Sequence, residues 1–303
     1  MTTVSIREYV VAGPDDGPYA LTTGPDGALW FTLVHSGRIG RLVPGEEPVS
    51  HPVDPAGQPT IIVAGPDGAL WFTETAADRI GRITTDGVVT GFPLPNAGSG
   101  PFGLATGPDG ALWFTESTAD RIGRIGTDGR VDEFPLPTTG GYPSVIVAGP
   151  DEALWFTLNQ ANAIGRIDPA GAVGLHPLPT AGAAPVGITA GPDGALWFVE
   201  IAAGQVGRIT PDGVITEFPL PDRAARPHAI TAGPDGALWF TEWGGNRVGS
   251  VAPDGIIEVH DLPRPRCEPH GITAGPDGAL WTALEVGVLA RVAAGHGRVD
   301  RTG

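Results

Sequence analysis

Two histidines and two glutamates in the last third of the chain have the side chains best suited to chemistry. Glu268 and His270 lie two positions apart, His228 precedes them and Glu285 follows them. Carboxylates from separate loops are hard oxygen ligands of the kind that bind Mg²⁺. An imidazole with a pKa near neutrality can act as a general base. These residue types predict a metal-assisted acid–base site, provided that the fold brings them together.

The elements that position these side chains can be read from an internal repeat. The sequence Gly-Pro-Asp-Gly-Ala-Leu-Trp-Phe-Thr at residues 24–32 returns in closely related form six more times, beginning at Gly65, Gly107, Gly149, Gly191, Gly233 and Gly275. A repeat of about 42 residues fixes the architecture before any other feature is considered. Residues that all copies share are scaffold, and residues that only one or two copies carry are candidates for function.

Each copy predicts four short strands. In the third copy, apolar runs at 102–106 and 111–116 flank a Gly-Pro-Asp-Gly turn, and strands at 121–125 and 130–134 follow. Four strands in every copy, with no helical periodicity, predict an all-β protein. We expect a seven-bladed β-propeller of four-stranded antiparallel blades that forms a single domain over residues 1–303.

The closure of the ring depends on the two ends of the chain. The last copy has only a weak fourth strand in its tail at residues 297–303, whereas Val4–Val10 resembles the outer strands of the other copies. We therefore predict that the N-terminal strand completes the seventh blade. A closed ring has no sheet edge that demands a partner, so we expect a monomer. Glu152 replaces the last turn glycine of the fourth copy, where it must adopt a left-handed backbone or change the turn.

The connections that vary between copies lie on one face of a propeller, and functional residues are expected there. One varying position follows the proline that opens each inner strand. Histidine stands at this position only in copies six and seven, as His228 and His270, while copy one has Tyr19. Blades six, seven and one are neighbours in a closed ring, so these three side chains are expected to meet.

The loop after the second strand shows a matching departure. Trp243 of copy six and Glu285 of copy seven occupy the same position of this loop, and Glu268 precedes His270 by two residues. The alternative is that the histidines are polar residues at a wet channel mouth and the glutamates are solvated loop charges. The coincidence of four departures on two adjacent blades favours a functional site.

The remaining histidines and the cysteine have simpler interpretations. Three histidines occupy an outer-strand position that holds Phe in other copies, so we expect them to fill aromatic-sized space: His51, His176 and His260. His35, in a loop of blade one, could border the site, but we expect it to lie on the surface. Cys267 has no activating motif nearby and is expected to be an unreactive thiol.

A column of glutamates recurs at the end of the second strand, close to arginines that follow it. We expect ion pairs between blades from these residues: Glu74, Glu116, Glu200 and Glu242, with Arg79, Arg121 and Arg247.

The composition excludes several classes of partner. The net charge is −16 and all 18 basic residues are arginine, so a nucleic-acid or membrane-surface protein is not expected. The single cysteine suits a reducing compartment. No signal peptide or membrane-spanning run is visible, and we expect a cytoplasmic protein.

The chain resembles the virginiamycin B lyase family over essentially its whole length. The shared Leu-Trp-Phe-Thr-Glu strings are weak evidence because related propellers carry them. The sharper similarity lies at Ala225–Gly233, Thr241–Gly244 and Glu268–Ile272.

The resemblance implies roles for the residues of the cluster. Glu268 and Glu285 would help to hold a catalytic Mg²⁺, and His270 would be the general base. His228 would contact the substrate, and Tyr19 matches a tyrosine at the entrance of the family's site. The stretch around Glu285 matches the family less closely than the others.

The implied reaction is elimination at the ester bond of a type B streptogramin, a cyclic depsipeptide antibiotic, which would confer resistance. His270 would take the α-proton of the threonine residue whose oxygen forms the ester, and Mg²⁺ would stabilise the developing charge. We expect Trp243 to help bind this substrate. Two other functions remain open: a metal-dependent lactone hydrolase and a propeller that binds a ligand without catalysis.

Overall fold

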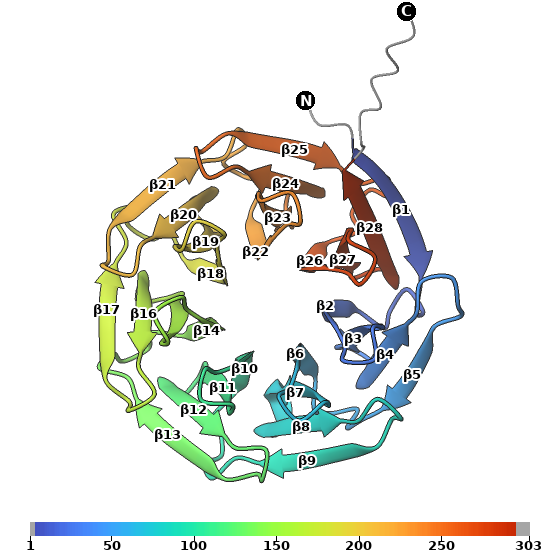
Figure 1. The fold of residues 1–303 in the computed structure, drawn as a ribbon, viewed down its shortest axis with the longest axis horizontal. Helices are drawn as coiled ribbons and strands as arrows, with labels where there is room; N and C mark the ends of the chain where they lie inside the picture. Colours follow the sequence, from blue (N-terminus) through green and yellow to red (C-terminus); the bar gives the residue numbers. More distant parts are fainter. Residues whose placement is uncertain (1–3, 295–303) are drawn as a thin grey trace, which may run out of the picture.

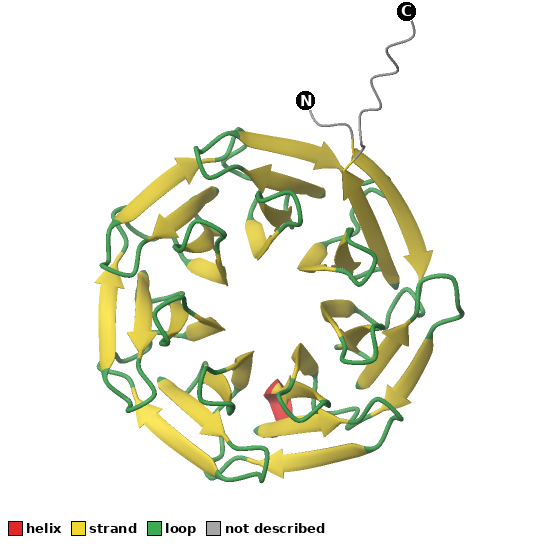
Figure 2. Ribbon diagram, in the orientation of Figure 1, coloured by secondary structure: helices red, strands yellow, loops and turns green. Residues whose placement is uncertain are grey.

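The structure of this protein is a computed structural model that describes residues 4–294, and these residues form a ring of seven four-stranded antiparallel sheets (Figure 1). The predicted seven-bladed β-propeller is therefore confirmed. Within the described range the ring contains one short 3₁₀ helix, η1 (Thr75–Ala77), beside strands and turns (Figure 2). No helix in this part of the chain has the length and apolar character needed to cross a lipid bilayer.

The first two strands of every blade face the centre of the ring. The innermost strands each begin at a proline: β2 (Pro18–Thr23), β6 (Pro59–Ala64), β10 (Pro101–Thr106), β14 (Pro143–Ala148), β18 (Pro185–Ala190), β22 (Pro227–Ala232) and β26 (Pro269–Ala274). The second strands are fully buried: β3 (Leu29–Leu33), β7 (Leu70–Glu74), β11 (Leu112–Glu116), β15 (Leu154–Leu158), β19 (Leu196–Glu200), β23 (Leu238–Glu242) and β27 (Leu280–Leu284).

The third and fourth strands form the outer half of each blade. The third strands are β4 (Arg38–Leu42), β8 (Arg79–Ile83), β12 (Arg121–Ile125), β16 (Ala163–Ile167), β20 (Gln205–Ile209), β24 (Arg247–Val251) and β28 (Val288–Ala294). The outermost strands are β5 (Val49–Pro52), β9 (Val89–Pro93), β13 (Val131–Pro135), β17 (Val173–Pro177), β21 (Ile215–Pro219), β25 (Ile257–Asp261) and β1 (Val4–Val10).

The ring is closed by its N-terminal strand. β1 pairs antiparallel with β28, with Val4 opposite Ala294 and Val10 opposite Val288. The resulting sheet has the order β1-β28-β27-β26, so blade seven is built from both ends of the described chain (Figure 1). The prediction of N-terminal closure is confirmed. The weak strand considered at residues 297–303 lies outside the described residues.

The repeated turn is held by one aspartate that binds two partners. In blade one, Asp26 accepts a hydrogen bond from Trp30 Nε1 at 3.0 Å and another from Arg41 Nε at 2.8 Å. A Cβ on Gly24 would lie 2.4 Å from the Trp30 ring, which explains the glycine that opens the motif. Burial acts to raise the pKa of Asp26, but these two hydrogen bonds outweigh it, and the pKa lies below its usual value.

The core consists of aromatic layers between blades. Six of the repeated tryptophans and six phenylalanines are completely or almost completely buried. A Cβ on Gly40 would lie 2.1 Å from the Phe31 ring, so glycine in the third strand makes room for the phenylalanine of the second. The three outer-strand histidines stack on the tryptophan of their own blade, as predicted for aromatic fillers: His51 on Trp30, His176 on Trp155 and His260 on Trp239.

Two details of the repeat settle open questions. Glu152 has φ of 58°, so it adopts the left-handed backbone that glycine has in the other copies. The expected ion pairs between blades were wrong in their placement. Glu116 binds Arg121 at 2.8 Å within one blade, because the two residues are opposite each other in the β11–β12 hairpin. Glu74 and Glu242 pair in the same way, whereas Glu200 receives a hydrogen bond from Gln205.

Candidate active site

Three aromatic rings from adjacent blades meet at the centre of one face. Tyr19, His228 and His270 each follow the proline that opens an inner strand, β2, β22 and β26 respectively. The ring centroids of Tyr19 and His270 are 4.5 Å apart, and those of His228 and His270 are 4.9 Å apart. Tyr19 Oη lies 3.4 Å from His228 Nε2. The structure therefore brings together the three residues expected to meet across blades six, seven and one.

A threonine of the neighbouring blade holds the backbone of His270. Thr241 Oγ1 donates a hydrogen bond to the carbonyl oxygen of His270 at 2.8 Å. The matching threonine of other blades makes the same cross-blade bond, as Thr115 does to Ser144 at 2.6 Å. Blades five and seven carry Val199 and Ala283 at this position, and neither has a hydroxyl group. The inner strand of His270 is thus held by a threonine of blade six. The inner strands of His228 and Tyr19 lack this bond, because Val199 and Ala283 stand where the threonine would be.

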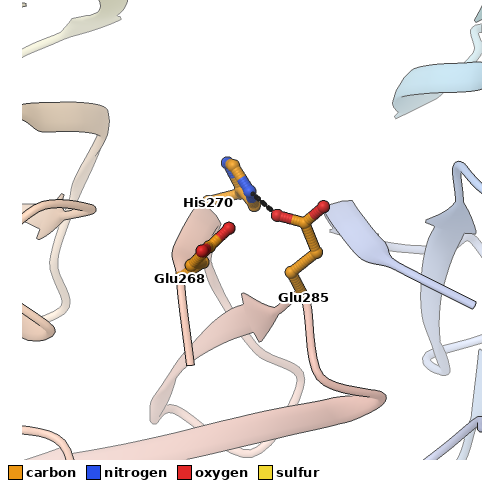
Figure 3. A group of neighbouring side chains, drawn as sticks. All are labelled: Glu268, His270 and Glu285. Atoms are coloured by element: carbon orange, nitrogen blue, oxygen red, sulfur yellow. Dashed lines mark hydrogen bonds and ion pairs between the residues drawn. The ribbon is translucent and has the colours of Figure 1, made fainter. Parts of the chain in front are cut away.

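The carboxylates of Glu268 and Glu285 both lie beside His270 (Figure 3). Glu268 lies just before β26, and Glu285 lies just after β27. The possible ligand atoms of Glu268, His270 and Glu285 all lie within 4.8 Å of one another. Residues of three separate sequence positions therefore converge as predicted, although Glu285 comes from the stretch with the weaker resemblance.

The backbone at Glu268 is shaped by the repeat and not by the site. Glu268 has φ of 48°, in the left-handed region. The equivalent residue of every blade is left-handed too: Gly17, Gln58, Gly100, Tyr142, Ala184 and Arg226. The fold offers this conformation seven times, and blade seven uses it to direct a carboxylate toward His270.

Glu285 is bound by two histidines. Its Oε2 lies 2.7 Å from His270 Nε2, and its Oε1 lies 2.7 Å from His35 Nε2. The hydrogen bond from His270 is the main reason that the pKa of Glu285 is lowered to about 2; burial opposes the shift, and the bond from His35 adds to it. Glu285 is therefore ionised at neutral pH. His35, which the sequence placed on the surface, is half-exposed but belongs to the site.

His228 and Tyr19 are uncharged at neutral pH. The pKa of His228 is lowered to about 3, mainly by burial. The nearby His270 lowers this pKa as well, and Glu285 opposes the shift. Burial also raises the pKa of Tyr19 well above its usual value. A neutral imidazole and a phenol present hydrogen-bond donors and acceptors without net charge, and such groups suit the amide and ester oxygens of a peptide.

Trp243 lies in a neighbouring part of the same face. The Arg226 guanidinium lies 5.4 Å from the centre of the Trp243 ring, in cation–π contact. Both residues line a hollow of about 450 Å³ together with Arg266 and Glu268. Trp243 is thus adjacent to the carboxylate side of the site, whereas Tyr19 and His228 border a smaller apolar hollow of about 140 Å³ in the centre of the ring.

The donor atoms fit a hard divalent cation. Glu268 is exposed and Glu285 is ionised, so two carboxylates face one small space, with His270 as a third possible ligand. Oxygen donors of this kind suit Mg²⁺, which keeps several water or substrate ligands. Cys267 takes no part: it is buried, and burial raises the pKa of its thiol to about 12, as expected for an unreactive cysteine.

Comparison with known proteins gives one consistent family. The family model described as the virginiamycin B lyase family matches residues 4–292. Virginiamycin B lyases from Saccharopolyspora erythraea and Streptomyces coelicolor are 64% and 60% identical over 52 residues, a segment that spans 17% of this chain and 17% of each relative.

Solved structures agree with this match over nearly the whole chain. A streptogramin B lyase structure and a virginiamycin B lyase from Staphylococcus aureus are each 43% identical, with TM-scores of 0.93, and cover 96% of this chain and 98% or 99% of their own. A catalytically inactive His-to-Ala variant of the S. aureus enzyme, solved with quinupristin, is 42% identical with the same TM-score of 0.93.

Proposed function

We propose, since the chain belongs to the virginiamycin B lyase family, that it inactivates type B streptogramins by opening their ester bond through elimination. The observation that carries this proposal is the convergence of His270 with Glu268 and Glu285 at one end of the ring. The fold alone would not support it, because propellers serve many functions.

His270 is the proposed general base. Its Nδ1 is buried without a partner among the described residues, whereas its Nε2 lies 2.7 Å from Glu285 Oε2. We assign Nε2 as the atom that takes the α-proton of the threonine residue in the ring. The ionised Glu285 stabilises the imidazolium that forms. The inactive His-to-Ala variant of the S. aureus enzyme supports a catalytic histidine in this family.

The elimination balances without water. The Cα–H electron pair forms the Cα=Cβ bond of a dehydrated threonine residue, the Cβ–O bond breaks, and the carboxylate leaves. The proton ends on His270, and the linear product has the mass of the substrate. A hydrolase would instead add one water.

Mg²⁺ is the proposed cofactor, held by Glu268 and Glu285. When bound, it would supply a Lewis acid that polarises substrate oxygens and stabilises negative charge. The two glutamates would hold the cation beside His270, the proposed base. The ligand oxygens of the two glutamates lie within 4.8 Å of each other, and a bound cation would offset the repulsion between their charges.

The rest of the substrate has two places to bind. Tyr19 and His228 offer neutral polar groups above the apolar centre of the ring. The hollow lined by Trp243 and Arg226 extends the site on the side of Glu268. We propose that these two regions hold the parts of the cyclic depsipeptide that flank the ester.

We also propose that the protein is a monomer and that it lies in the cytoplasm. Closure of the ring by β1 supports a monomer, because the blade that joins the two chain ends is complete. The single cysteine suits the cytoplasm. Sedimentation that changes with protein concentration would contradict the monomer.

Mass spectrometry tests the reaction directly. A type B streptogramin is incubated with the protein in Mg²⁺ and then in EDTA. A linear product of unchanged mass, formed only with the metal, is expected. A product heavier by one water would instead indicate the hydrolase, and no product would leave a propeller that binds another ligand.

A further inference from the structure

The carboxylate of Glu285 is held from two sides by two different blades. His270 of blade seven faces Oε2, and His35 of blade one faces Oε1, each at 2.7 Å. A contact of this length to an ionised carboxylate requires the imidazole nitrogen to donate its proton. Both oxygens of Glu285 are therefore fixed by hydrogen bonds.

The two histidines cannot serve Glu285 equally during the proposed reaction. His270 can accept the substrate proton on Nε2 only in the tautomer whose proton is on Nδ1, and in that tautomer Nε2 donates no bond to Glu285. His35 lies on the opposite oxygen and has no such duty. Its bond to Oε1 does not depend on which nitrogen of His270 carries the proton.

We propose that His35 is a positioning residue that keeps the Glu285 carboxylate oriented toward the cation site while His270 acts as the base. This inference rests on the function proposed above. It goes beyond it by assigning a role to a residue from blade one, across the seam that closes the ring. Hydrogen-bond partners of metal-binding carboxylates are part of the metal site because they fix the ligand orientation.

Gly17 is the second half of this arrangement. A Cβ on Gly17 would lie 2.4 Å from Cδ2 of the His35 ring, so any other residue there would displace the imidazole. The left-handed backbone alone does not demand glycine, because five blades carry a larger residue at this position: Gln58, Tyr142, Ala184, Arg226 and Glu268. Glycine in blade one leaves room for the His35 ring.

The decisive experiment measures metal affinity apart from turnover. Mn²⁺ binding to the protein is followed by electron paramagnetic resonance, with and without a type B streptogramin, for the wild type, His35→Ala and His35→Gln. We expect His35→Ala to weaken Mn²⁺ binding by about 10-fold or more. Gln keeps a donor group and should restore part of the affinity. Because His35 is half-exposed, the melting temperature should change little.

A matched pair of glycine variants separates positioning from backbone strain. Gly17→Ala and Gly100→Ala introduce the same methyl group at the same left-handed position of blades one and three. Both should lower stability, but only Gly17→Ala should weaken Mn²⁺ binding. The double variant Gly17→Ala with His35→Ala has no imidazole for the introduced methyl group to displace. Its loss of Mn²⁺ affinity should therefore equal that of His35→Ala alone.

Turnover gives the second readout. His35→Ala should raise the Mg²⁺ concentration for half-maximal activity by about 10-fold, with most of kcat recovered at saturating Mg²⁺. An unchanged Mn²⁺ affinity in His35→Ala would overturn the proposal, as would a wild type that binds no Mn²⁺ under either condition. A wild type that binds Mn²⁺ with the expected His35 dependence but does not open the antibiotic would contradict only the proposed function.

Discussion

The two faces of the ring use carboxylates in opposite ways. On the face of the Gly-Pro-Asp-Gly turns, Asp109 receives hydrogen bonds from Trp113 and Arg124 at 3.0 and 2.7 Å. On the opposite face, Glu285 is held by two histidines, and the exposed Glu268 faces the same space. The turn aspartate is paired with arginine, a permanent cation, whereas Glu285 is paired with imidazoles, which are not permanent cations.

The difference separates stability from function within one repeat. A carboxylate whose partners are arginine and tryptophan is satisfied and has no reason to bind a ligand. A carboxylate opposed by a second carboxylate and by imidazoles is open to a cation. Because every blade supplies the same backbone, the side chains alone decide which of these two outcomes a position has.

Removing the base should have the largest effect. His270→Ala should lower kcat/KM for streptogramin opening by about 10³-fold, within the range that general bases contribute. The melting temperature should stay close to that of the wild type, because the ring of His270 packs against the site residues Tyr19 and His228. Steady-state kinetics and calorimetry check both statements. Retention of full activity would remove His270 from the mechanism.

A pair of left-handed glutamates tests the two faces directly. Glu268 and Glu152 have φ of 48° and 58°, but they lie on opposite faces. Glu268→Gln should lower activity at limiting Mg²⁺ by about 10²-fold, since a charged ligand is lost. Glu152→Gln should leave activity unchanged. Activity measured against Mg²⁺ concentration, with EDTA as the zero point, distinguishes them, and equal effects would refute the contrast between the faces.

Charge on the turn face should affect stability alone. Asp109→Asn keeps a Trp113 partner but loses the ionic bond to Arg124, and should cost about 1 kcal/mol of unfolding free energy. In blade six, Ser250 replaces the arginine, and Asp235 binds Trp239 with both oxygens at 3.1 Å. Asp235→Asn should therefore cost less. Urea unfolding gives both values, and kcat should be unchanged in each variant.

A purely pH-dependent effect is expected at Glu200, a buried carboxylate that is hydrogen-bonded by the amide of Gln205. Burial raises the pKa of Glu200 to about 8, and the bond from Gln205 only partly opposes this. Between the unfolded pKa near 4.5 and about 8, the folded chain keeps a proton that the unfolded chain has lost, so stability falls as the pH rises through this window. Glu200→Gln should remove this fall.

The measurement is the free energy of unfolding at pH 5 and pH 8. We subtract the free energy of unfolding of the wild type from that of Glu200→Gln at each pH. This difference should be larger at pH 8 than at pH 5 by at least about 1 kcal/mol, roughly the value of one pKa unit. Glu242→Gln, which breaks a pair with Arg247, should be destabilising at pH 8. The same difference in unfolding free energy at pH 5 and at pH 8 would contradict the raised pKa of Glu200.

Most of the fold could be predicted because the repeat provides its own alignment. The seven copies revealed the turns, the strand order and the pairing of Val4–Val10 with the last blade. The site could be predicted to the level of Glu268, His270 and Glu285, because each differs from its own column.

The alignment of the seven repeats did not reveal features that depend on contacts between residues in different columns of the alignment. His35 lies one residue beyond the loop position of Glu285, so a comparison of single columns did not align the two. The signal was present in Gly17, whose missing side chain makes room for the His35 ring. The Glu–Arg pairs were misplaced between blades because the hairpin register, in which Glu116 faces Arg121, was not worked out.

Closure by β1 also sets the order in which the site can form during synthesis. Tyr19 and His35 are synthesised before Glu268, His270 and Glu285. The blade that carries the carboxylates is complete only when β1 pairs with β28, the contact most distant in sequence. We therefore expect the site proposed for the cation to be complete only after this pairing, in the last cooperative step of folding.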